Sequence, residues 1–350
     1  MNELINEIGF IAVGQAGGNL GNQFESKGHT ILYINTSRKD LDTLSDAKNK
    51  FQIPGADGAA QDRNNAQDSV IDNWDTLNIR IDEVIKEKII FVIFSAAGGT
   101  GSGASPMLME RMIQDNPGRR IGAIAILPGV NEPPQAQANA WSCLQELKKL
   151  DDTGPIFIVD NNTRKDKFTL NDEFVELFES FLRLPEIADK RGVTDSADLK
   201  RALDCCGCAV LAKLQQNQNS TAELLNSLEN NIFAPMENDG VIEYILLSMS
   251  SYIEMEEFKS KVGEPMAIFL GYNQQQTVCL LSGLSFPDTR LDGMEKLAIE
   301  VNERRKKARV QKQEKLTEDK SLDIDLGTAK KQKTKLSKEE LFAKYRKKKS

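Results

Sequence analysis

The sequence predicts an α/β protein built on a parallel sheet with helices on both faces. Apolar runs typical of strands alternate with helical segments from about residue 8 to about residue 165. The runs Ile8–Val13, Ile89–Ser95 and Ile121–Leu127 are almost wholly apolar, which favours strands buried on both faces. The chain has 350 residues, enough for about two domains that each bury a core.

The other elements of the first half follow in order. Strands are predicted at 30–34 and 156–159, helices at 20–26, 70–86, 106–114 and 141–150, and glycine-rich turns at 14–21 and 98–103. Each of these turns follows a strand and opens a helix. Such a place binds anions well, because backbone N–H groups and the positive end of the helix dipole meet there.

The second half begins with an amphipathic helix at Asn171, which Pro185 can kink or end early. The segment 208–214 and a helix from Ser220 come next, and strands at 241–248, 266–270 and 277–284 predict a second sheet. A long helix over 290–312, a disordered linker from Glu314 and a short helix from Ser337 follow. These signals divide the chain into a first domain (1–170), a central helix (171–191), a smaller α/β domain (192–287), a C-terminal helix (288–313) and a flexible basic tail (314–350).

Composition excludes several classes of protein. The one histidine, His29, makes a Ser-His-Asp or Cys-His catalytic site improbable, and the five cysteines lack the spaced pairs of a metal site. We expect reduced thiols in the cytoplasm. The sequence contains no apolar run of the ~20 residues that cross a bilayer, and Met1–Ile5 does not resemble a signal peptide.

Charge is unevenly distributed along the chain. Residues 328–350 carry nine lysines and one arginine against two glutamates, a net charge of +8, whereas the whole chain is −7. The body is therefore strongly acidic. An acidic body with a basic tail suggests two separate tasks.

The first glycine-rich segment, Gly14–Gly21, matches neither the dinucleotide motif G-x-G-x-x-G nor the P-loop motif. An oxidoreductase would also place an acid where Asn35 ends the second strand. The segment is either a phosphate site or a tight packing turn. The second segment, Gly98–Gly103, is more specific, because four glycines and two hydroxyl side chains between a buried strand and a helix are unusual in a linker.

These two segments resemble the nucleotide loops of the tubulin/FtsZ superfamily, although Ala97 replaces one leading glycine of the tubulin signature. Asn35–Ser37 resembles the second loop, Gly58–Ala60 with Arg63 the third, and Leu127–Pro134 the fifth. Asn171 and Asp172 resemble the guanine contacts. By this resemblance the GTP-binding residues are Gly14, Gln15, Ala16, Gly17, Gly18, Asn19, Asn35, Thr36, Gly58, Ala59, Ala60, Ala97, Gly98, Gly99, Thr100, Gly101, Ser102, Gly103, Asn161 and Asn171.

The resemblance covers about residues 8–310 and implies a tubulin/FtsZ-like GTPase that binds GTP or GDP and forms head-to-tail filaments. It implies Mg²⁺ held through the phosphates and water, without a protein ligand. Within the superfamily the stretches Ile34–Ile53 and Asp160–Arg164 are most similar to the TubZ family, which segregates plasmid or prophage DNA. That likeness implies a DNA-bound adaptor of the TubR kind on centromere DNA as a partner, and no membrane.

Two acids, Asp195 and Asp198, follow Gly192 in a turn that opens the next helix. One interpretation is that Asp195 caps the helix while Asp198 is solvated. The superfamily resemblance implies instead that both are catalytic: in tubulin-like filaments the acids at this position enter the nucleotide site of the next subunit and polarise the attacking water. Val193 stands where FtsZ carries an asparagine, and its side chain has no polar atom for a third contact.

The tail combines apolar and basic residues. We expect an adaptor-binding peptide made of Leu341, Phe342, Lys344, Tyr345, Arg346, Lys347, Lys348 and Lys349. A solvated charged tail and direct contact with DNA phosphates are the alternatives. Alternative functions for the whole chain are a phage- or cell-encoded filament for DNA centring or cell division, a nicotinamide-dependent oxidoreductase and a scaffold without hydrolysis.

Overall fold

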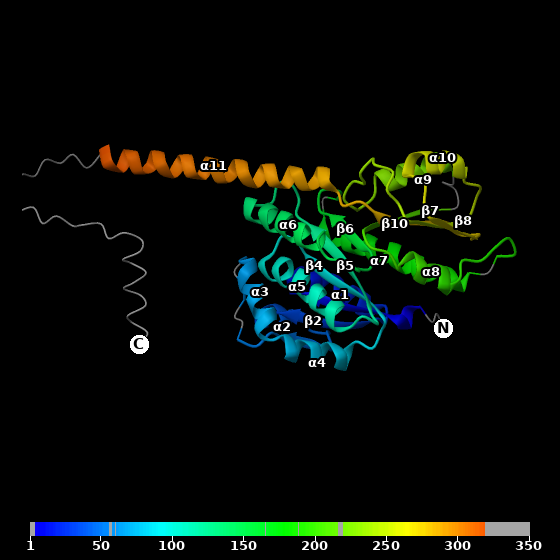
Figure 1. Cartoon of the computed structure of the whole chain (residues 1–350), viewed down its shortest axis with the longest axis horizontal. Helices are drawn as coiled ribbons and strands as arrows, with labels where there is room; N and C mark the ends of the chain where they lie inside the picture. Colours follow the sequence, from blue (N-terminus) through cyan, green and yellow to red (C-terminus); the bar gives the residue numbers. More distant parts are fainter. Residues whose placement is uncertain are drawn as a thin grey trace, which may run out of the picture. The chain divides into compact units, whose positions relative to one another are not determined.

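The computed structural model describes residues 4–55, 58–59, 61–164, 166–187, 189–215 and 220–318 (Figure 1). Its strands are β1 (Ile8–Val13), β2 (Thr30–Asn35), β3 (Lys50–Gln52), β4 (Ile89–Ser95), β5 (Arg120–Leu127), β6 (Ile156–Asp160), β7 (Cys208–Gln215), β8 (Tyr244–Met249), β9 (Ala267–Tyr272) and β10 (Gln276–Leu284). Its α-helices are α1 (Gly14–Ser26), α2 (Arg38–Asp42), α3 (Arg63–Asp72), α4 (Trp74–Val84), α5 (Gly99–Asp115), α6 (Pro134–Leu147), α7 (Lys167–Leu182), α8 (Ser196–Ala202), α9 (Thr221–Glu229), α10 (Met255–Val262) and α11 (Asp288–Glu318). Two short 3-10 helices are η1 (Ile5–Glu7) and η2 (Leu184–Glu186).

The described strands form one sheet in the order β3-β2-β1-β4-β5-β6-β7-β10-β8-β9. From β3 to β7 all neighbours are parallel, whereas β10 runs antiparallel to both β7 and β8. The prediction of a separate second sheet is therefore wrong. β7 joins β6 through only the pairs Ile156↔Cys208 and Phe157↔Ala209, a short seam between distant segments that periodicity cannot reveal.

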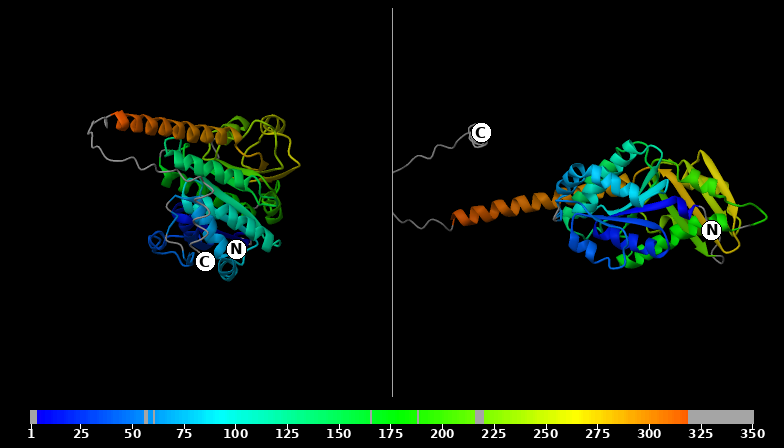
Figure 2. Two further views of the ribbon diagram at one scale, coloured as in Figure 1. Left: turned by 60° about the vertical axis from the view of Figure 1, so that its left-hand side comes forward. Right: turned by 90° about the horizontal axis from the view of Figure 1, so that it is seen from below.

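Aromatic packing fixes α1 and α7 on the same face of the sheet. Phe24 of α1 stacks on Phe10 of β1, with ring centroids 4.4 Å apart. Phe178 of α7 meets Phe91 of β4 edge to face at 5.4 Å, and Phe24 at 5.7 Å. Helix α5 contacts both α3 and α6, and these helices cover the other face (Figure 2). The predicted α/β class, with its sheet covered on both faces, is confirmed.

Several element boundaries differ from the predicted ones. The two glycine-rich segments are helical rather than turns, since they form the first turns of α1 and α5. The helix predicted over 70–86 is two helices, α3 and α4. The helix is interrupted at Asn73, which lies between α3 and α4. The side-chain amide of Asn73 donates to the carbonyls of Ser69 (2.9 Å) and Pro54 (3.2 Å).

The long helices also differ from their predicted ranges. α7 starts before Asn171 and ends at Leu182, and Pro185 lies in η2 behind it. α11 runs on to Glu318, past the predicted end at residue 313. The chain divides into a main unit that ends at Asn302 and a second unit that begins at Glu303, within α11. The short helix predicted from Ser337 and the adaptor-binding residues lie outside the described residues.

Candidate nucleotide site

A cavity of about 390 Å³ lies at the carboxyl ends of β1 and β4. It is lined by Val13, Gly14, Gln15, Ala16, Ser37, Asp40, Gly58, Ala59, Gln61, Ser95, Gly98, Gly99, Thr100 and Gly101. The first turns of α1 and α5 both face it, so the free N–H groups of two helix starts converge there. This arrangement suits a group with several negative charges, such as a polyphosphate.

Glycine serves two different purposes around this cavity. Gly14 has a φ of +74°, a left-handed conformation that turns the chain sharply from β1 into α1. At Gly17 a Cβ would collide with the carbonyl of Ile93, and at Gly101 it would lie 2.7 Å from the carbonyl oxygen of Ser95. The latter two glycines therefore let helices approach strands. The packing interpretation holds for them, although Gly101 also lines the cavity.

Hydroxyl and amide contacts join the segments around the cavity. The hydroxyls of Thr36 and Thr100 lie 2.8 Å apart, within hydrogen-bond distance, and Gly58 donates its N–H to the carbonyl of Thr36 at 3.1 Å. Asn35 is buried, and its side-chain oxygen accepts the N–H of Ser37 at 3.0 Å. Asn35 thus shapes the turn rather than lining the cavity.

Arg63 has a structural role that follows from Pro106. A proline inside α5 has no N–H to donate to the carbonyl four residues earlier, that of Ser102. The Arg63 guanidinium donates to this carbonyl instead, at 2.9 and 3.3 Å, and also pairs with Glu146 at 2.5 Å. Arg63 therefore stabilises the glycine-rich start of α5 from outside, although it does not line the cavity.

Asn139 of α6 also holds this part of the site, and no sequence motif predicted it. Its buried side-chain amide donates to the carbonyls of Ala97 (3.1 Å) and Gln61 (3.2 Å). It thereby ties the segment before α5 to the segment before α3. Ser37, Asp40 and Gln61 line the cavity and were likewise not among the predicted contacts. Their polar side chains lie next to predicted loop residues in the sequence, and this proximity could have indicated that they line the cavity.

A polar path leads from the cavity to the start of α7. Gln15, Asn19 and Gln23 are spaced four residues apart along α1, on one face of the helix. Gln15 lines the cavity and Asn19 is exposed, while the Gln23 amide donates to Asp172 of α7 at 2.7 Å. The predicted base-contacting end of α7 is thus joined to the helix that opens at the cavity.

The other residues predicted near the base have structural partners. Asn161 donates its side-chain amide to Glu132 at 3.3 Å, and Asn171 is largely buried in the first turns of α7. The Glu132 carboxyl, although partly buried, has its pKa lowered by hydrogen bonds from Lys167 and the N–H of Gly129. Neither asparagine lines the cavity. Ala60 lies outside the described residues.

The predicted catalytic acids lie near the amino-terminal ends of the parallel strands, opposite the cavity at their carboxyl ends. Asp195 caps α8 by accepting the N–H groups of Ala197 (2.8 Å) and Asp198 (2.9 Å), and Asp198 accepts the N–H of Asp195 at 3.1 Å. Lys200 of α8 bonds Glu7, directly before β1, at 2.6 Å. Gly14 follows β1, whose six residues span roughly 20 Å, so α8 and the cavity lie at opposite ends of this strand.

The chain matches the model for "Tubulin/FtsZ family, GTPase domain" over residues 7–166. Residues 7–166 are a tubulin/FtsZ-family GTPase domain. This domain contains the cavity and both glycine-rich helix starts, so the chain is a GTPase and its ligand is a guanine nucleotide. Among the described residues, neither a cluster of side chains suited to a metal ion nor a helix long and apolar enough to cross a membrane is found.

The GTPase domain has relatives among tubulin-like proteins. The chain is 28% identical over 324 residues to the tubulin-like protein TubZ of Clostridium botulinum C phage, covering 91% of this chain and 90% of that protein. The structure of Clostridium botulinum phage c-st TubZ with a truncated C-terminal tail matches with a TM-score of 0.79 at 27% identity, covering 86% of this chain and 99% of that one. The GTPγS-form protofilament of Bacillus thuringiensis serovar israelensis TubZ shares the fold at 16% identity, with a TM-score of 0.73 and coverage of 87% and 94%.

Proposed function

We propose that this GTPase assembles head to tail into filaments and hydrolyses GTP at sites shared by adjacent subunits, in order to segregate plasmid or phage DNA. The observation that carries the proposal is the separation of cavity and acids. Asp195 and Asp198 lie at the amino-terminal edge of the sheet, about one strand length from the cavity in the same chain. They can serve only the cavity of another subunit.

The phosphates need positive charge that the cavity itself lacks. None of its described lining residues is lysine or arginine, and Asp40 is the one carboxylate among them. We infer that Mg²⁺ enters with the nucleotide, held by phosphates and water, with Asp40 as a partner for that water. Bound there, the ion would neutralise phosphate charge. Backbone N–H groups at the starts of α1 and α5 would orient the phosphates.

The role in DNA segregation rests on the likeness to TubZ and on the basic tail. We expect a DNA-bound adaptor of the TubR kind, on centromere DNA, to bind the tail residues from Leu341 to Lys349. The five cysteines are free thiols, which supports a location in the cytoplasm. A tubulin-like filament for DNA centring or cell division stays the alternative, because it would use the same fold and cavity.

The shared site is tested by the dependence of GTP turnover on protein concentration. Turnover per subunit should rise steeply above a critical concentration, while dilute subunits bind GTP and hydrolyse it slowly. A mixture of Asp195→Ala with Gly98→Trp supplies the complementary test. At Gly98 an added Cβ meets no atom within 4 Å, so the indole can fill the cavity without disturbing the fold. Recovery of turnover in the mixture would support a shared site, whereas turnover per subunit that does not vary with concentration would refute it.

A further inference from the structure

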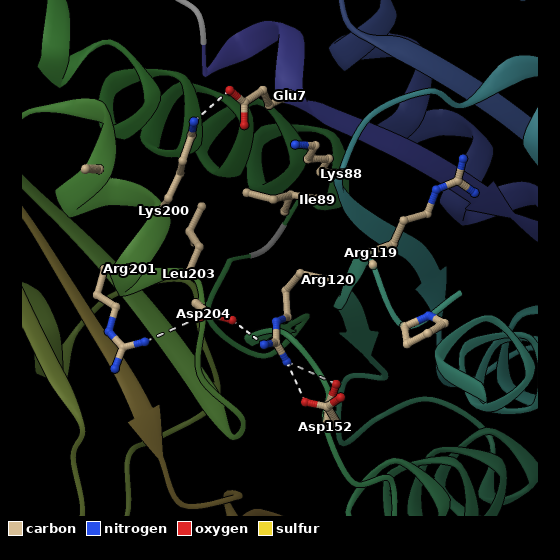
Figure 3. A pocket seen from close by; sticks show the side chains of 13 residues that line it. Glu7, Lys88, Ile89, Arg119, Arg120, Asp152, Lys200, Arg201, Leu203 and Asp204 are labelled. Carbon is tan, nitrogen blue, oxygen red and sulfur yellow. Dashed lines mark hydrogen bonds and ion pairs between the residues drawn. The ribbon is translucent and has the colours of Figure 1, made fainter. Parts of the chain in front are cut away.

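A second cavity, of about 470 Å³, lies beside α8 at the amino-terminal edge of the sheet (Figure 3). Its walls come from Ala197, Lys200 and Arg201 of α8, from Leu203 and Asp204 behind it, and from Glu7, Lys88, Ile89, Pro117, Gly118, Arg119, Arg120 and Asp152. This cavity belongs to the edge that carries Asp195 and Asp198, not to the nucleotide site.

α8 has one buried side and another side that borders the cavity. Leu199 and Ala202 are buried, and the helix contacts β8. Ser282 of β10 donates its hydroxyl to the carbonyl of Ala202 at 2.8 Å. Toward the GTPase domain the helix borders the cavity through Ala197, Lys200 and Arg201.

Two sets of ion pairs bridge the open side (Figure 3). Lys200 of α8 bonds Glu7 at 2.6 Å. Arg120, the first residue of β5, pairs with Asp204 behind α8 and with Asp152 at 2.9 Å. Arg119 lines the same cavity but pairs with Asp82 of α4 at 2.7 Å and makes no such bridge.

The bridging groups lie on elements that lead to the nucleotide. Glu7 precedes β1, whose far end carries Gly14, and Arg120 begins β5, whose far end leads into 127–134. Burial opposes the charge of Arg120, but hydrogen bonding to Asp152 and the charges of Asp204 and Asp152 raise its pKa. Its planar guanidinium can hold two carboxylates from separate segments at once.

We propose that Glu7 and Arg120 are positioning residues that fix α8, and hence how Asp195 and Asp198 are presented to the next subunit's nucleotide. The inference rests on the proposed shared site. Half-exposed ion pairs add little to overall stability, so their loss affects the placement of the acids rather than the fold. A shift of about 1 Å in a reacting group can lower a rate by a factor of about 10².

A charge swap between Glu7 and Lys200 tests the positioning. Glu7→Lys and Lys200→Glu should each lower turnover at saturating GTP in assembled protein by about fivefold or more, the size of a lost half-exposed pair with added repulsion. GTP affinity of dilute subunits should stay unchanged. The double variant, with its pair restored in reverse, should recover turnover to within about twofold of the parent, since paired charges couple. Arg120→Ala should behave like the single variants.

Arg119→Ala is the matched control, because it removes a cation from the same cavity without touching α8. It should leave turnover and assembly unchanged. Failure of the double swap to restore turnover, or an equal loss in Arg119→Ala, would overturn the positioning role while Asp195→Ala still stops hydrolysis. If Asp195→Ala itself leaves turnover intact, the shared site is wrong and the positioning role falls with it. Thermal unfolding of every variant separates misfolding from misplacement.

Discussion

The guanidinium of Arg290, in the first turn of α11, donates to the carboxylate of Asp160 at the end of β6, at a distance of 2.7 Å. Only 10% and 3% of these two side chains are exposed. Arg290 also donates to the carbonyl of Pro128 at 2.7 Å. One residue of the C-terminal helix therefore holds both the end of β6, at Asp160, and the segment Leu127–Pro134, which resembles the fifth nucleotide loop.

Replacing Arg290 with alanine should destabilise the protein by about 3–5 kcal/mol, because it leaves a buried carboxylate without its partner. Lysine cannot donate to two acceptors in the same plane and should restore only part of the loss. Urea unfolding measures the stability change, and nucleotide titration should show weaker GTP binding as well. A loss below about 1 kcal/mol would mean that the pair contributes no more than a surface one.

Variants at Asp195 can separate helix capping from catalysis. Asparagine and serine cap helices about as well as aspartate, whereas alanine costs roughly 1 kcal/mol. If the carboxylate acts on water in the next subunit, Asp195→Asn, Asp195→Ser and Asp195→Ala should all lower turnover by a factor of about 10² or more. GTP binding and assembly should persist. Full activity in the asparagine variant would reduce Asp195 to a helix cap.

Asp172 should determine the preference for guanine over adenine nucleotides. Its carboxylate can accept the N1–H and amino group of guanine, while Gln23 holds one of its oxygens at 2.7 Å. Asp172→Asn should weaken GTP binding by about 1.5–3 kcal/mol, the range for a hydrogen bond to a charged group. Fluorescence titration with GTP and ATP measures the selectivity. Equal affinity of the parent protein for ATP would contradict the base assignment and leave the fold assignment untouched.

The cysteines should differ sharply in reactivity. Burial raises the pKa of the Cys205 thiol to about 11, and it also raises the pKa values of Cys143, Cys208 and Cys279. Cys206 is exposed. Brief treatment with iodoacetamide near pH 8 should therefore alkylate Cys206 alone, as mass spectrometry of peptides would detect.

The same thiols predict how stability changes at alkaline pH. Because burial raises the folded-state pKa values of these thiols, the protonated thiols contribute to the free energy of unfolding. This contribution is complete below the unfolded-state pKa of about 8.5 and is lost as pH rises above it. The free energy of unfolding should therefore fall between about pH 8.5 and 11. A Cys205→Ala variant, which lacks one of these groups, should lose less stability over this range.

Deletion of residues 330–350 should spare GTPase activity and assembly, because the cavity and α8 lie elsewhere in the chain. The same deletion should abolish co-sedimentation with an adaptor–DNA complex. Added salt should weaken that capture by the full-length chain, since screening acts on exposed charges. Equal capture by the truncated and full-length proteins would reduce the tail to a solvated end.

The sequence was sufficient for the parallel half of the sheet and the GTPase family, because buried strands and glycine-rich junctions leave local patterns. It was insufficient where distant groups decide the structure. Gly17 and Gly101 lie in helices despite the low helix propensity of glycine. Only a residue without a Cβ fits at these two positions, because α1 and α5 approach the backbone of β4 so closely there. The hydrogen bond from Arg63 to the Ser102 carbonyl forms because Pro106 leaves that carbonyl free and because α3 packs against α5. Neither condition could be predicted from the residues around Arg63 alone. The single sheet likewise depends on the β6–β7 seam, which has no counterpart in local periodicity.

The orientation of β1 has a mechanical consequence for any filament that stacks these subunits head to tail. Glu7 precedes this strand at the end near α8, and Gly14 follows it at the end beside the cavity that we propose for the phosphates. A pulling force between neighbouring subunits would therefore run along the strand, through covalent bonds, while the ladder hydrogen bonds to β2 and β4 lie across the force. Such a subunit should resist tension and yield first at its contacts with its neighbours.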